Sequence, residues 1–102
     1  MEILIRYFDG CPNWQGARDR LWEALSAEGM ATGCRIAFER VASTEDADRL
    51  GFAGSPTILV NGADPFAQDG APTGLTCRIY RTESGMQGSP SVAQLRALLS
   101  ST

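Results

Sequence analysis

The sequence contains no histidine and no lysine, and all nine of its basic residues are arginines. These absences exclude a Ser-His-Asp or Cys-His catalytic pair, a histidine metal site, a lysine Schiff base and a P-loop lysine. The formal net charge is -3 and the arginines are scattered, so there is no basic face of the kind that nucleic acid requires. We therefore expect no nucleic-acid partner.

Long apolar runs are also missing. No stretch approaches the roughly 18 consecutive apolar residues of a membrane span, and the N-terminal segment lacks the basic and apolar regions of a signal peptide. Cysteine is scarce: Cys11, Cys34 and Cys77 form an odd set without CxxC spacing, which is typical of a reducing compartment. The sequence predicts a cytoplasmic protein with no membrane partner, no cysteine metal site and at least one free thiol.

The chain of 102 residues has the length of one domain, residues 1–102, with one hydrophobic core. Apolar periodicity, turn residues and helix-start signals predict seven elements in chain order: strand 2–8, buried on both faces, helix 14–28, strand 35–41, helix 43–51, strands 57–60 and 76–81, and a helix starting at Ser89-Pro90. Residues 63–74, rich in Gly, Pro and Asp, are expected to form a long loop between the last two strands. Phe66 in this loop could be a lid residue or could pin the loop to the sheet.

A chemical motif, Cys11-Pro12, stands where the first strand gives way to the first helix. With Cys11 as N-cap and Pro12 as the first helical residue, the sulfur would face the amides of Asn13 and Trp14 and the positive end of the helix dipole. Such positions lower a cysteine pKa from about 8.5 to between roughly 3.5 and 7.5, and Asp9 would oppose this by charge repulsion. Cys11 is therefore the candidate nucleophile.

A second motif, Ser55-Pro56-Thr57, opens the third strand. Together with Cys11-Pro12 and the element order, it resembles the thioredoxin-like superfamily over nearly the whole chain apart from residues 63–74. The resemblance implies an α/β, thioredoxin-like domain: a four-stranded mixed sheet in the order 2-1-3-4, with the first and third helices on one face and the second on the other. It also implies that Pro56 is cis and lies against Cys11, and that the backbone of Ser55 is free to pair with an extended peptide or a thiol ligand.

Trp14 replaces the second cysteine of the family's CxxC motif, so the chain is similar to the monothiol members. Trp14 could be a core anchor of the helix or a platform for substrate. A monothiol enzyme needs a resolving thiol from elsewhere, and the candidates are Cys77 and Cys34. A hairpin of strands 57–61 and 77–81 would place Cys77 opposite Asn61, at the pole away from Cys11, although the long loop could bring it back. Cys34 is expected at that same far pole.

The resemblance thus implies a thiol-disulfide oxidoreductase that acts on disulfide-containing proteins or small thiol adducts, with no cofactor beyond an external reducing thiol. Cys11 would be catalytic, Cys77 a possible resolving thiol, and the substrate-binding residues would be Pro12, Asn13, Trp14, Ser55, Pro56 and Thr57. Two alternatives stay open: a non-catalytic thioredoxin-like module that binds a partner chain along the proline edge, and capture of soft metals or organomercurials by the thiols.

Overall fold

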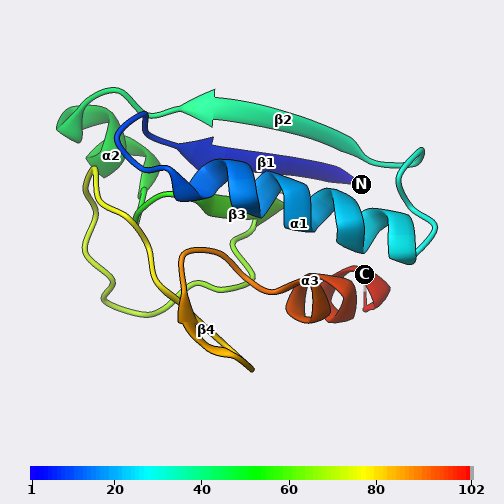
Figure 1. Ribbon diagram of the computed structural model, residues 1–102. Helices are drawn as coiled ribbons and strands as arrows, with labels where there is room; N and C mark the ends of the chain where they lie inside the picture. Colours follow the sequence, from blue (N-terminus) through cyan, green and yellow to red (C-terminus); the bar gives the residue numbers. More distant parts are fainter. Residues whose placement is uncertain (102) are drawn as a thin grey trace.

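The computed structural model describes residues 1–101. In chain order its elements are β1 (Glu2–Tyr7), α1 (Asn13–Ala27), β2 (Arg35–Arg40), α2 (Thr44–Leu50), β3 (Thr57–Val60), β4 (Tyr80–Thr82), β5 (Gly85–Gln87) and α3 (Val92–Ser100) (Figure 1). The α/β class is therefore confirmed. Within residues 1–101, no helix has the length and apolar content needed to span a membrane.

The main sheet has three strands in the order β2-β1-β3. β1 and β2 are parallel, from Glu2 opposite Arg35 to Tyr7 opposite Arg40, and α1 forms the crossover between them. β3 runs antiparallel to β1, with Ile3 opposite Val60. The sheet is mixed, as expected, but the predicted fourth strand does not join it.

The expected fourth strand, residues 76–81, is wrong in both extent and partner. β4 begins only at Tyr80 and forms a separate antiparallel hairpin with β5. Upstream of Tyr80, the chain makes one isolated parallel bridge, between Cys77 and Ser55, just before β3 begins. Because the segment pairs at the start of β3 rather than alongside it, the sheet ends at β3 and the chain leaves toward the hairpin.

One face of the sheet carries the main core. Ile3 and Ile5 of β1 and Ile58 of β3 are at most 1% exposed and pack against α1 and α3 (Figure 1). The buried residues of the two helices in this core are Leu21, Ala24, Leu25, Leu95 and Leu99. The predicted placement of the first and third helices on one face is confirmed.

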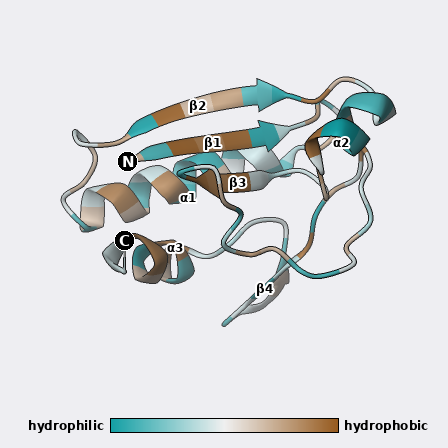
Figure 2. Cartoon of the chain, turned by 180° about the vertical axis from the view of Figure 1, so that it is seen from behind, coloured by the Kyte–Doolittle hydropathy of each residue, from teal (hydrophilic) through white to brown (hydrophobic). Residues whose placement is uncertain are grey.

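The opposite face is open, contrary to the expectation that residues 2–8 are buried on both sides. α2 lies at one end of the sheet, where its Ala47 packs with Val41 and Phe52 in a second, smaller core cluster (Figure 2). Leu4 and Leu59 are only half-buried and line a pocket of about 660 Å³ on this face. A helix of seven residues is too short to cover the sheet.

Two of the predicted helix starts can be compared with their caps. The Ser43 side chain accepts a hydrogen bond from the Asp46 amide, so the predicted start of α2 is confirmed. α3 begins later than Ser89-Pro90, because Ser91 is its N-cap and forms a reciprocal capping box with Gln94. In this capping box each side chain accepts a hydrogen bond from the backbone amide of the other residue, so two backbone donors are satisfied. A helix start at Ser89-Pro90 would not satisfy both donors.

Candidate functional site

Cys11 ends the turn that follows β1, and its amide donates to the Phe8 carbonyl at 3.2 Å. α1 starts at Asn13 with Pro12 as N-cap, so the expected capping role of Cys11 is wrong by one residue. Pro12 has helical dihedral angles and makes no side-chain capping bond, so the helix enters directly from the turn at Cys11. The Cys11 side chain is 1% exposed, and its Sγ donates to the Ser55 carbonyl at 3.4 Å.

Cys77 lies against Cys11, with 2.8 Å between the two sulfur atoms, and both are free thiols. The prediction that Cys77 sits at the far pole of the sheet is therefore wrong. Its basis was an antiparallel hairpin with β3, whereas Cys77 forms a parallel bridge with Ser55. This pairing carries Cys77 to the end of the sheet where β1 meets α1.

The backbone of Ser55 joins the two cysteine segments. Its amide donates to the Thr76 carbonyl at 2.8 Å, and its carbonyl accepts from the Arg78 amide at 2.9 Å as well as from Cys11 Sγ. The expectation that this backbone is free to pair with a bound chain is wrong, because the protein's own residues 76–78 occupy it. The Ser55–Pro56 peptide bond is cis, as the resemblance implies.

The two thiols form a chain of hydrogen bonds that ends at the Ser55 carbonyl. The Cys77 thiol donates to Cys11 Sγ, and the Cys11 thiol donates in turn to Ser55. The hydrogen bond to Cys11, the partial burial of the thiol and its electrostatic interaction with Cys11 all raise the pKa of Cys77. Cys77 therefore holds its proton more firmly than an ordinary thiol and offers it to Cys11.

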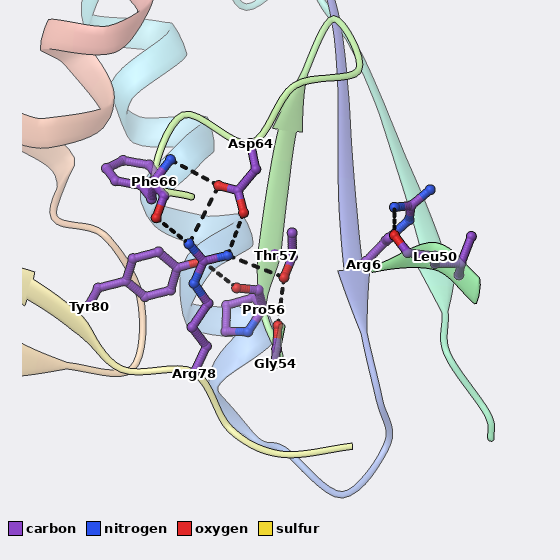
Figure 3. Close-up of polar contacts among 9 residues, drawn as sticks. All are labelled: Arg6, Leu50, Gly54, Pro56, Thr57, Asp64, Phe66, Arg78 and Tyr80. Carbon is purple, nitrogen blue, oxygen red and sulfur yellow. Dashed lines mark hydrogen bonds and ion pairs between the residues drawn. The ribbon is translucent and has the colours of Figure 1, made fainter. Parts of the chain in front are cut away.

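The residue after Cys77, Arg78, inserts its guanidinium between β3 and the long loop (Figure 3). It forms an ion pair with Asp64 at 2.7 Å, donates to the Phe66 carbonyl at 2.6 Å and reaches the Thr57 hydroxyl at 3.4 Å. It also lies over the ring of Tyr80, 4.7 Å from its centroid. We call this set the Arg78 anchor; it consists of Arg78, Asp64, Phe66, Thr57 and Tyr80.

Sequence reasoning missed the Arg78 anchor, because the sequence of residues 77–82 does not show which side of the segment is covered. In residues 77–82 the buried side alternates, since Arg78, Tyr80 and Thr82 are covered while Cys77, Ile79 and Arg81 are exposed. An arginine at a covered position of a strand-like alternation requires an internal acidic or carbonyl partner. Phe66 is shown to pin the loop to the domain, because it packs on the main core and meets the Tyr80 ring edge-on.

The other expected site residues lie near Cys11 in sequence but contact other groups. Pro12 is exposed. The Asn13 side chain sits where a Cβ on Gly88 would fall. Trp14 stacks on Tyr7 with ring centroids 4.3 Å apart, which makes it part of an aromatic cluster. Thr57 is buried and donates to the Gly54 carbonyl, so its hydroxyl supports the turn before β3.

Asp9 and Cys34 make their contacts away from the thiol pair. Asp9, expected to repel a Cys11 thiolate, forms an exposed ion pair with Arg40 at 2.6 Å. Cys34 precedes β2 and packs against the main core near Met1, at the opposite end of β1, as predicted. Within residues 1–101, His, Cys, Asp and Glu side chains form no group of three or more that could hold a metal ion.

A pocket of about 640 Å³ opens beside Cys77, between residues 76–81 and the long loop. Its lining includes Cys77, Arg78, Tyr80, Phe66 and Gln68. This volume lies within the range of small-molecule sites, about 300 to 1,000 Å³. The Cys77 side of the thiol pair is therefore the side that a small molecule can approach.

Comparison with protein-family models, with curated proteins and with solved structures gave no match for this chain.

Proposed function

We propose that the protein catalyses thiol-disulfide exchange with Cys11 and Cys77 as its redox pair, and that it is a divergent member of the thioredoxin-like superfamily. The observation that carries the proposal is the contact of 2.8 Å between the two sulfur atoms. The parallel β1-α1-β2 unit, the antiparallel β3 and the position of Cys11 after β1 support the family assignment. Cys77 supplies the second sulfur that Trp14 displaces from the CxxC position.

The order of the two sulfurs follows from their exposure. Cys77 is exposed, whereas Cys11 is 1% exposed and lies beneath it. A disulfide R-S-S-R would therefore meet Cys77 first, so Cys77 takes the role of attacking thiol that the sequence suggested for Cys11, and Cys11 becomes the resolving thiol. Because the pKa of Cys77 is raised by its hydrogen bond to Cys11, the attack should be slow at neutral pH and faster as the pH rises.

The chemical steps balance without a cofactor. Cys77 loses its proton, attacks one sulfur of the substrate and forms a Cys77-S-S-R bond, while R-S⁻ leaves and takes up a proton. Cys11 then loses its proton to water and attacks Cys77 Sγ, which forms the Cys11-Cys77 disulfide and breaks the Cys77-S-S-R bond; the second R-S⁻ leaves and takes up a proton. The two cysteines are oxidised and the substrate is reduced to two thiols. An external thiol reductant returns the pair to its reduced state.

A small disulfide or small thiol adduct fits this site better than an extended protein chain. The Ser55 backbone that an extended chain would pair with is taken by residues 76–78. The pocket beside Cys77 has the volume of a small-molecule site. The alternative of a module that binds a partner chain at this edge loses its main support for the same reason.

The test is reaction of purified Cys11→Ser, Cys77→Ser and Cys34→Ser variants with bis(2-hydroxyethyl) disulfide, followed by intact mass and released thiol. Cys34→Ser is the matched control and should react as the unmodified protein does, losing two hydrogens in mass and releasing both halves of the substrate. Cys11→Ser should stop at a mixed disulfide on Cys77. Rapid adduct formation on Cys11 in Cys77→Ser, with none on Cys77 in Cys11→Ser, would contradict the proposed order.

A further inference from the structure

We infer that Arg78 is the positioning residue that holds Cys77 against Cys11, through its anchor on Asp64 and Phe66 of the long loop. This inference rests on the proposed function, because it concerns the same redox pair. It makes the loop at residues 63–74 part of the redox machinery, although no loop residue touches either sulfur in the contacts described above.

The backbone pairing of its own segment holds Cys77 only weakly. Cys77 belongs to neither β3 nor β4. Its segment is joined to Ser55 by two backbone hydrogen bonds, one at Thr76 and one at Arg78. A single bridge of this kind is a small fraction of a strand ladder. Something beyond the bridge must therefore fix the segment.

Arg78 supplies that attachment from the adjacent residue. The Arg78 side chain is 11% exposed and that of its partner Asp64 18%, so this pair is more enclosed than the other ion pairs within residues 1–101. The planar fork is used on two sides, toward the Asp64 carboxylate and the Phe66 carbonyl. Burial makes such a pair costly to break, because removal of one partner leaves the other charge without compensation.

The loop end of the anchor is itself rigidly built. Asp64 accepts a hydrogen bond from the Phe66 amide at 2.9 Å, which fixes the carboxylate within a tight turn. Phe66 then packs on the main core and against Tyr80. The guanidinium is thus tied, through Asp64 and Phe66, to the main core, which also contains Ile3 and Ile5 of β1.

A glycine permits the close approach on the other side. Gly54 has φ +117°, and a Cβ there would lie 2.9 Å from the Arg78 Cβ. Only glycine accommodates both this conformation and this contact. Arg78 is therefore held between Gly54 and the loop, and Cys77 is positioned by what holds its neighbour.

The consequence is measurable as a reduction potential. The more firmly Cys77 is held beside Cys11, the higher the effective concentration of one thiol at the other and the more stable the disulfide. A contact that stabilised the reduced and oxidised folds equally would not move this potential. The potential thus separates positioning from a general contribution to stability.

The experiment measures the Cys11-Cys77 potential in glutathione redox buffers, in a Cys34→Ser background, for Arg78→Lys and Asp64→Asn. Arg96→Lys is the matched control, because Arg96 forms a surface ion pair with Glu28 and does not line the pocket beside Cys77. Both anchor variants should make the disulfide less stable by about tenfold, a shift of about 30 mV to less negative potential, and Arg96→Lys should leave it unchanged. The double variant should shift it no further than the larger single effect, because Asp64 acts through Arg78.

Folded anchor variants with the potential of the parent would overturn the inference while leaving the redox pair intact. If Arg78→Lys does not fold, Asp64→Asn decides, since it keeps the size of the side chain and the hydrogen bond from Phe66. If the parent protein forms no Cys11-Cys77 disulfide in any buffer, the proposed function itself is wrong.

Discussion

Oxidation of Cys11 and Cys77 to a disulfide should raise the free energy of unfolding by about 4 kcal/mol. The perturbation is the removal of two hydrogen atoms, and the structure lets us expect nearly the full effect. The sulfur atoms are already 2.8 Å apart, so the bond forms with little displacement of the backbone.

The magnitude follows from the length of chain that the bond would close. The two cysteines are 66 positions apart. Loop-closure entropy for a cross-link of that span contributes about 4 kcal/mol, through the lost freedom of the unfolded chain. Domains of this size have unfolding free energies of about 5 to 15 kcal/mol, so the expected gain is a large part of the total.

Urea denaturation with and without a phosphine reductant measures the gain, again in the Cys34→Ser background so that no other disulfide can form. With slopes of about 1 to 3 kcal/mol/M, the oxidised protein should unfold at least about 1 M urea higher than the reduced protein. Equal midpoints in the two states, or a lower midpoint after oxidation, would refute the claim that the reduced fold already holds the sulfurs in bonding position.

Three further outcomes are expected. First, Cys11→Ala should raise the rate at which Cys77 is alkylated at neutral pH, because it removes the hydrogen bond that raises the pKa of Cys77; an unchanged or slower rate, followed by peptide mass spectrometry, would contradict the bond. Second, burial raises the pKa of Tyr80, so the phenol contributes its full stability below the pKa of about 10 that it has in the unfolded chain, and this stability is lost at higher pH. Ultraviolet titration should show one phenol that ionises only as the protein unfolds, and Tyr80→Phe should abolish that late step. Third, Ser55→Ala should leave stability unchanged or raise it by about 1 kcal/mol, because the buried Ser55 hydroxyl has no hydrogen-bond partner among residues 1–101 and the backbone bonds of Ser55 remain; a loss of more than about 1 kcal/mol in urea denaturation would show that the hydroxyl has a role.

Local sequence signals predicted the parts of the fold that depend on local physics. The apolar run before Asp9, the helical periodicity after Cys11 and the alternation in residues 35–41 were enough for the β-α-β unit and for the face that carries the core. The capping serine of α2 and the glycine that ends it were likewise visible, since both act on neighbouring backbone groups.

The thiol pair could not be located in this way, because its geometry depends on contacts between distant residues. Residues 76–81 have the composition of a strand whether they run alongside β3 or cross its start. Their course is set by hydrogen bonds to the Ser55 backbone and by the ion pair between Arg78 and Asp64, a residue of the long loop. Neither contact leaves a period in the sequence. Because these contacts lead residues 76–81 across the start of β3, the sheet has three strands and Cys77 lies beside Cys11.

Disulfide mapping of the oxidised protein shows whether Cys11 and Cys77 form a redox pair. The purified chain is oxidised with excess bis(2-hydroxyethyl) disulfide, digested without reduction and read by mass spectrometry. We expect one linked peptide pair, joining Cys11 to Cys77, with Cys34 recovered apart from them. Recovery of Cys11 and Cys77 as separate thiols, or a bond from either of them to Cys34, would contradict it.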